Sequence, residues 1–159
     1  MTRISFAVGI VCAVALASVA LSQSKDKTKA SATRKAIQTD HAPKAIGPYS
    51  QAIQAEGSRM LFLSGQIALD PKTGNLAEGD TAAQTERVME NLKGVLGAAG
   101  LDFSNVVRCT LFVTDLAEFA RINEVYGRYF TASPPARATV QVSALPRGAK
   151  IEIDAIAAF

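Results

Sequence analysis

The sequence predicts an α+β domain in which two helices pack on one face of a single mixed β-sheet. Two segments repeat apolar residues at helical spacing, and shorter segments show the alternating or continuous apolar runs of strands. Their order along the chain is two strands, helix, strand, helix, two strands, which fits one sheet covered by helices on one side. The opposite face of the sheet then needs cover, and self-association would supply it in so small a domain.

The strands are predicted from their apolar patterns and from the turns that bound them. Residues 49–55 and 59–67 flank a Glu-Gly-Ser turn, and this spacing predicts a hairpin. Residues 105–113 contain VVRCTLFV, which is apolar enough for a central strand. Residues 138–142 and the alternating segment 150–157 complete the set.

The first helix is predicted over residues 80–99. Thr81 and Gln84 fit a capping box at its start, and Gly100 stops it. Its apolar stripe consists of Val88, Leu92, Val95, Leu96 and Ala99.

The second helix begins after Asp115, which we expect to cap it. Its apolar stripe consists of Phe119, Ile122, Tyr126 and Phe130. The Ser-Pro-Pro sequence at 133–135 ends it, because the residue before a proline is disfavoured in a helix.

The N-terminal residues have the features of a secretory signal. Arg3 supplies a positive start, residues 4–21 form an uncharged apolar run, and small residues at Ala20 and Ser22 suit cleavage. We therefore expect a signal peptide over residues 1–22 and an exported protein, periplasmic or secreted. An uncleaved membrane anchor is the alternative, because 18 apolar residues lie at the lower limit for a membrane span.

The remaining chain divides into a polar linker, residues 23–36, and a folded domain, residues 37–159. The domain holds 11 Lys or Arg against 13 Asp or Glu, so its net charge is −2. The basic excess of the whole chain therefore lies outside the domain, and this argues against a nucleic-acid partner. We also expect no stable membrane association after cleavage.

Cysteine and histidine are too scarce for metal or disulfide chemistry in the predicted mature chain. Cys109 is then the only cysteine, and it lies in an apolar run that is typical of a buried, inert thiol. His41 is the only histidine, so neither a metal site nor a Ser-His-Asp triad is expected.

Several segments, taken together and in order, resemble the RidA (YjgF) family of imine deaminases. The similarity runs from about Ile37 to the C-terminus. The segments are APKAIGPYSQ at 42–51, SGQI at 64–67, PKTG at 71–74, AAGL at 98–101, FVTDL at 112–116, Phe130, PAR at 135–137, LP at 145–146 and IEI at 151–153.

The resemblance implies a chorismate-mutase-like fold and a homotrimer with ligand sites in the clefts between subunits. It implies hydrolysis of 2-iminobutyrate and 2-iminopropanoate to 2-oxo acids and ammonia, without cofactor or metal. Such a reaction needs a cationic anchor for the substrate carboxylate, a hydrogen bond to the imine nitrogen and a positioned water.

Arg137 and Glu152 are the candidate catalytic residues. Arg137 matches the family's carboxylate-binding arginine, and a guanidinium offers two parallel donors to a carboxylate; from pattern alone, it would be a surface arginine paired with an acid. Glu152 matches the family's catalytic glutamate, which positions or deprotonates water. Strand alternation alone would place both Glu152 and Asp154 on a polar face.

The resemblance assigns substrate contacts to five further residues. Tyr49 offers a hydroxyl, Ser64 and Gly65 lie at the end of a strand where glycine permits close backbone approach, and Asn123 lies near the apolar stripe of the second helix. Thr139 departs from the family, in which many members have cysteine at this position. Attack by water needs no thiol, so we keep Thr139 as a binding residue.

Three other functions remain open at this point. The first is a ligand-binding or chaperone-like trimer without turnover, against which the pair Arg137 and Glu152 argues. The second is an endoribonuclease, against which the acidic domain and the lack of a suitable histidine base argue. The third is a deaminase of another imine or enamine outside the cytoplasm.

Overall fold

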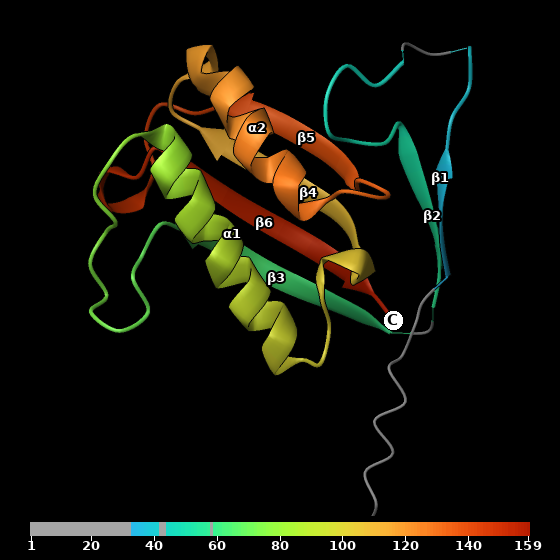
Figure 1. Cartoon of the computed structure of the whole chain (residues 1–159), viewed down its shortest axis with the longest axis horizontal. Helices are drawn as coiled ribbons and strands as arrows, with labels where there is room; N and C mark the ends of the chain where they lie inside the picture. The colour runs from blue at the N-terminus through green and yellow to red at the C-terminus, as the bar shows by residue number, and fades with distance from the viewer. Residues whose placement is uncertain (1–32, 42–43, 58) are drawn as a thin grey trace, which may run out of the picture.

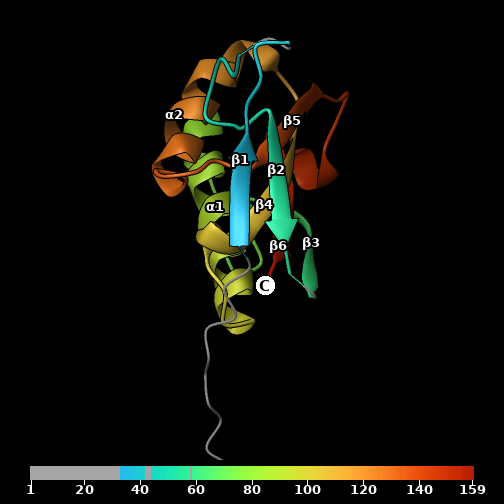
Figure 2. The same cartoon turned by 90° about the vertical axis from the view of Figure 1, so that its right-hand side faces the viewer.

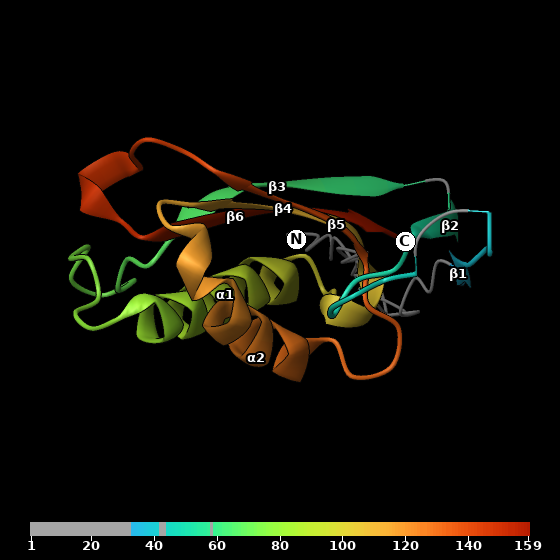
Figure 3. The same ribbon diagram turned by 90° about the horizontal axis from the view of Figure 1, so that it is seen from above.

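Two helices lie on one face of a β-sheet, as the sequence predicts. The computed structural model describes residues 33–41, 44–57 and 59–159. Within these, α1 (Thr81–Ala98) and α2 (Phe119–Tyr129) lie side by side under the sheet (Figures 1 and 3). The α+β class is confirmed. The predicted signal peptide and most of the predicted linker lie outside the described residues.

The main sheet has four strands in the order β3, β6, β4, β5. These are β3 (Met60–Ile67), β4 (Val106–Val113), β5 (Ala136–Gln141) and β6 (Ile151–Ala158). β4 and β5 run parallel and the other neighbours antiparallel, so the sheet is mixed, as expected. β6, the last strand of the described chain, therefore lies between β3 and β4.

The predicted hairpin between the first two strand segments is wrong. β2 (Ala52–Glu56) pairs with β1 (Thr33–Ile37), while the antiparallel partner of β3 is β6. Residues 33–36, which the sequence analysis assigned to the linker, lie in β1. This pair of strands forms a separate two-stranded sheet, and a bridge between Ser50 and Ala136 joins the loop after Ile37 to β5 (Figures 1 and 2).

The core lies between the sheet and the two helices. Ile151, Ile153, Ala155 and Ala157 of β6 are buried, whereas the residues between them are only partly buried, which is the alternation expected of a strand with one covered face. The other face of the sheet carries apolar side chains that the single chain does not cover; Phe62, for example, is 71% exposed. An uncovered apolar face of this kind marks an interaction surface.

The cap of α1 differs from the prediction. The N-cap is Asp80, whose carboxylate accepts the backbone N–H of Ala83, and Thr81 is already inside the helix. Gln84 instead joins two loops: its side chain accepts the N–H of Lys150 and donates to the carbonyl of Ala77. A carboxylate one residue earlier thus replaces the Thr hydroxyl as the capping group.

The remaining helical turns are short. They are the 3-10 turns η1 (Phe103–Asn105), η2 (Leu116–Glu118) and η3 (Pro146–Gly148). Asp115 caps η2, which leads directly into α2, by accepting the N–H of Ala117. Gly100 has φ of +74°, a left-handed conformation that ends α1 as predicted. No helix in the described ranges is long and apolar enough to cross a membrane.

Candidate functional site

Arg137 lies on the helix-covered face of the sheet, near the start of β5. Its Cα pairs with that of Cys109, which is buried in the core, so both side chains point toward the helices. The guanidinium carbon lies 5.4 Å from the ring centroid of Tyr49, 5.4 Å from that of Phe119 and 5.0 Å from that of Tyr126. Three aromatic rings therefore lie within cation–π distance of the guanidinium.

The guanidinium of Arg137 has no acidic partner within the part of the chain that the structure describes. No carboxylate of the described residues lies within ion-pair distance of it, and its Nη1 is buried without a hydrogen-bond partner. Burial lowers the pKa of Arg137 below its ordinary value, and the nearby Tyr126 opposes this shift. An arginine remains protonated at neutral pH even so. The site therefore presents an uncompensated cation with free donors, which is the requirement for binding a carboxylate.

A pocket of about 450 Å³ opens beside Arg137. It is lined by Tyr49, Leu116, Phe119, Arg137 and Thr139, so Arg137 is its only cation and it contains no acid. The Oγ1 atom of Thr139 is buried without a hydrogen-bond partner. Thr139 lies two residues after Arg137 on β5, and the two side chains therefore share a face. The pocket can receive a small anion with an apolar substituent.

Asn123 lies close to Arg137, beneath the loop that contains Gly47. A Cβ added to Gly47 would lie 3.5 Å from the Asn123 amide and 3.5 Å from Arg137 Nη2, so the Gly47 backbone packs over both side chains. Asn123 Oδ1 is buried without a hydrogen-bond partner. Asn123 does not line the pocket itself, and its contact with a substrate stays a prediction.

The loop that carries Tyr49 is fastened to the segment before β5. Ser50 donates its hydroxyl to the carbonyl of Pro134 (2.6 Å) and its N–H to the carbonyl of Pro135 (3.1 Å). The Tyr49 hydroxyl accepts the N–H of Ile46 (3.2 Å). These bonds hold the Tyr49 ring beside Arg137, with its hydroxyl already in use as an acceptor but still able to donate.

Glu152 lies on the opposite face of the sheet from Arg137. Glu152 pairs with Phe112, and Arg137 pairs with Cys109; these two residues of β4 are three apart, so they point to opposite faces. Within one subunit, Arg137 and Glu152 therefore cannot contact the same small ligand. The structure brings Arg137, Thr139, Tyr49 and Asn123 together and places Glu152 elsewhere.

The second group consists of Glu152 and Gly65. A β-bulge interrupts the pairing of β3 and β6 between Leu63 and Gln66, and a Cβ at Gly65 would lie 1.9 Å from Glu152 Oε1. Glycine leaves space for the carboxylate at this point, and any larger residue would displace the Glu152 side chain. Ser64 lies in the same bulge and is exposed. Ser64 and Gly65 therefore lie within β3 and not at its end, where the sequence analysis placed them, and they accompany Glu152 and not Arg137.

Asp154 shares the face of Glu152 but has a structural contact. Its Oδ1 atom accepts the backbone N–H of Thr110 at 3.1 Å. Among the described residues, the Glu152 side chain makes no hydrogen bond of this kind, so its oxygens remain available. Which of the two carboxylates acts as a base stays a prediction, with Glu152 as the candidate.

Cys109 has no features of a nucleophile. It is buried, and this burial raises the pKa of its thiol to about 12. The thiol therefore stays protonated at neutral pH, as expected of an inert core cysteine. The described residues hold no group of three or more His, Cys, Asp or Glu placed to bind a metal ion.

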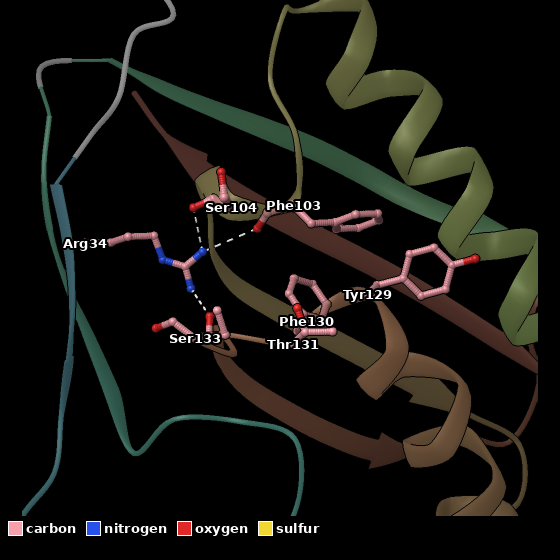
Figure 4. A pocket seen from close by; sticks show the side chains of 8 residues that line it. Arg34, Phe103, Ser104, Tyr129, Phe130, Thr131 and Ser133 are labelled. Carbon is pink, nitrogen blue, oxygen red and sulfur yellow. Dashed lines mark hydrogen bonds between the residues drawn. The ribbon is translucent and has the colours of Figure 1, made fainter.

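A second arginine lies in a cavity of about 240 Å³ between β1 and the end of α2 (Figure 4). Arg34 donates to the carbonyls of Phe103 (3.3 Å), Ser104 (2.7 Å) and Ser133. Its terminal nitrogens are therefore engaged by the backbone. This cavity contains a fastened arginine and is a poor candidate for an anion site.

Sequence reasoning missed the roles of Leu116, Phe119 and Tyr126. Phe119 and Tyr126 were assigned to the apolar stripe of the second helix, and Tyr126 is indeed fully buried. Nothing in helical periodicity separates a ring that fills the core from one that contacts an arginine. The available signal was the position of Leu116 and Phe119 directly after the FVTD motif, at the start of a helix.

Comparison with known proteins gives consistent matches over the folded part of the chain. The family model described as endoribonuclease L-PSP matches residues 39–159. The chain is 73% identical to protein DfrA of Myxococcus xanthus over 78% of this chain and 95% of that protein. It is 49% identical to the mouse 2-iminobutanoate/2-iminopropanoate deaminase over 78% of this chain and 90% of that protein.

A similarity to solved structures accompanies these sequence matches. The crystal structure of Escherichia coli TdcF with bound serine has a TM-score of 0.61 and 43% identity to this chain. The match covers 79% of this chain and 98% of that one.

Proposed function

This chain belongs to the RidA (YjgF) family, and from that premise we propose that it hydrolyses small 2-imino acids, such as 2-iminobutanoate and 2-iminopropanoate, to 2-oxo acids and ammonia. The observation that carries the proposal is Arg137, a partly buried guanidinium that faces a pocket and has no acidic partner in the described residues. Such a cation is suited to a substrate with one carboxylate.

Arg137 fixes the orientation of the bound substrate. Two parallel N–H donors hold the carboxylate, and the imine carbon next to it then lies near Thr139. The unpartnered Oγ1 of Thr139 can accept a hydrogen bond from the imine N–H. The substrate side chain is directed toward the apolar surface of Leu116 and Phe119.

The reaction consumes one water and needs no redox change. Protonation of the imine nitrogen makes C2 electrophilic; water attacks C2 and loses a proton to a base, which gives a carbinolamine. Proton transfer to its nitrogen and cleavage of the C–N bond then release ammonia and leave the 2-oxo acid. Glu152 is the proposed base, since a carboxylate accepts the proton of the attacking water.

Glu152 and Arg137 can serve one substrate only if they come from different subunits. They lie on opposite faces of the sheet in one chain, and the uncovered apolar face that carries Glu152 also includes the exposed Phe62 and Val140. We therefore include in the proposal a homotrimer in which this face meets the neighbouring subunit. Each site then combines Arg137 of one subunit with Glu152 of another.

A coupled assay tests the activity. An amino-acid oxidase generates imines in the assay, and the purified protein is expected to accelerate release of the 2-oxo acid. Binding of 2-oxobutanoate without any acceleration would instead identify a ligand-binding trimer without turnover.

Complementation tests the shared site. Arg137→Ala and Glu152→Gln subunits are each expected to be inactive alone, while trimers reassembled from both contain one site with two intact residues. Such mixed trimers should recover up to about a third of the wild-type rate. Absence of recovery in verified mixed trimers would contradict the division of the site between subunits.

Endoribonuclease activity is the second candidate, because the matching family model carries that description. The folded domain has a net charge of −2, and its single histidine, His41, is exposed. Both features make phosphate-backbone binding and acid–base cleavage less suited to this chain. An RNA-cleavage assay on Arg137→Ala and wild-type protein side by side decides between the two activities.

Export belongs to the proposal as well. The positive start, the apolar run of residues 4–21 and the small residues at its end support a cleaved signal peptide. Fractionation followed by N-terminal sequencing is expected to find a mature protein that begins near Gln23 outside the cytoplasm. A soluble cytoplasmic protein that retains Met1 would refute this part.

A further inference from the structure

Two arginines of α2 differ from Arg137 of β5 in their surroundings. Arg121 lies 3.4 Å from Glu118, and Arg128 lies 2.8 Å from Glu124. Arg137 has no such carboxylate partner among the described residues, although its guanidinium is more deeply buried than those of Arg121 and Arg128. Its neighbours are the rings of Tyr49, Phe119 and Tyr126, each with its centroid within 5.4 Å of the guanidinium carbon.

Aromatic rings attract a guanidinium without cancelling its charge. The face of a ring carries a negative quadrupole that attracts a cation within about 6 Å. A carboxylate partner would attract it more strongly, but it would also occupy the donors and oppose a second carboxylate. Rings can therefore hold the guanidinium in a fixed orientation while its N–H groups remain available to an anion.

We propose that Tyr49, Phe119 and Tyr126 form an aromatic cage that replaces an acidic partner of Arg137, and that Phe119 is a positioning residue that sets the affinity of the site for carboxylates. This inference rests on the proposed function, because it concerns the same arginine. The three rings come from separate places in the fold, namely the loop before β2, the first turn of α2 and the middle of α2.

Phe119 is the ring on which the cage can be tested. Tyr126 is fully buried, so its removal would leave a cavity and unfold part of the core. Tyr49 is tied to Ile46 through its hydroxyl. Phe119 is only partly buried at the start of α2, and it can be replaced with little damage to the core.

The experiment replaces Phe119 by phenylalanines that carry one, two and three ring fluorines. Fluorination weakens the quadrupole stepwise and changes the size of the ring very little. We expect the Kd for 2-oxobutanoate to rise with each fluorine, and Phe119→Leu to raise it by about two- to thirtyfold. Phe119→Tyr and Phe119→Trp keep an aromatic ring and should therefore bind 2-oxobutanoate with wild-type affinity. A Kd that is constant across the fluorinated series would overturn the positioning role.

Phe159 supplies the matched control. It lies under Arg59 at 4.4 Å, in the same kind of contact, at the β3 edge of the sheet and so at the edge opposite β5. Fluorination of Phe159 should leave the affinity for 2-oxobutanoate unchanged. An equal loss of affinity in both series would show a general effect of fluorine and would overturn the proposal.

A second measurement separates the cage from the proposed function. The Tm of the protein should fall with each fluorine at Phe119 when Arg137 is present, and should stay constant in an Arg137→Met background. This dependence needs no ligand. If the wild type binds no 2-oxobutanoate and turns over no imine, the proposed function fails, while the Tm series still decides whether the rings hold the arginine. A Tm that falls equally in both backgrounds would overturn the cage.

Discussion

Arg34 and Arg137 line separate pockets, and both lie near the buried pair Tyr126 and Cys109, yet their contacts differ. Both arginines are partly buried, and in both burial lowers the pKa while Tyr126 opposes the shift. Arg34 donates to three backbone carbonyls, whereas Arg137 makes no such bond and lies among rings. A buried arginine thus indicates an anion site only when its donors are free, and burial alone does not distinguish the two roles.

The largest expected difference between these pockets comes from Arg137→Ala. We expect kcat/KM for imine hydrolysis to fall by at least about 100-fold and 2-oxobutanoate binding to be lost, because the only carboxylate anchor is removed. Steady-state kinetics, with circular dichroism and light scattering as controls for fold and assembly, check this. Activity within twofold or so of wild type, a change of only about 0.4 kcal/mol, would remove Arg137 from the site.

Glu152→Gln tests whether the pocket of Arg137 depends on the opposite face of the sheet. We expect turnover to fall by roughly 100-fold, since the amide retains size but cannot accept the water proton, while 2-oxobutanoate still binds through Arg137. Asp154→Asn is the matched control. Its Oδ1 can still accept the N–H of Thr110, so stability should change by less than about 0.5 kcal/mol. A damaging Asp154→Asn with a harmless Glu152→Gln would reverse the assignment.

Arg34→Ala should give the opposite result to Arg137→Ala. Three carbonyl groups lose a charged donor, so the free energy of unfolding should fall by about 2 kcal/mol, whereas kcat/KM should remain within roughly threefold. Chemical denaturation and kinetics on the same preparation measure both quantities. A large loss of activity at full stability would mean that the Arg34 cavity takes part in the reaction.

Thr139→Cys is expected to have the smallest effect. Water attack does not use a thiol, and the replacement nearly conserves volume, so kcat/KM should change by less than about threefold. The variant should in addition become sensitive to thiol-modifying reagents. A large gain in rate would indicate thiol chemistry that Thr139 cannot perform.

The sequence predicted those parts of the fold that depend on local periodicity. The apolar stripes of α1 and α2 and the alternation in β6 located these elements within a few residues, because each pattern reflects one buried face. Local periodicity did not predict which strands pair with each other. A turn between β2 and β3 suggests a hairpin, but whether β2 prefers β1 is decided by contacts between residues far apart in sequence.

The sequence predicted individual residues of the candidate site but not how the fold groups them in space. Resemblance supplied Arg137, Tyr49, Asn123 and Thr139, which the fold brings together, and Glu152, which it does not. The odd spacing between Cys109 and Phe112 places the last of these on the other face, and this depends on strand register that no local pattern reveals. The rings of Phe119 and Tyr126 were not predicted beside Arg137 for a related reason, since an aromatic stripe on a helix has the same sequence pattern in a core and in a cage.

The position of β6 in the sheet has a consequence for synthesis of the chain. β6 lies between β3 and β4 and hydrogen-bonds to both, but it is the last of the described strands to be made. Until residues 151–158 have left the ribosome, β3 has no partner strand in the main sheet, and β4 lacks its antiparallel neighbour. The domain therefore cannot acquire its sheet progressively from the N-terminus. The position between β3 and β4 therefore stays open in the growing chain until residues 151–158 emerge.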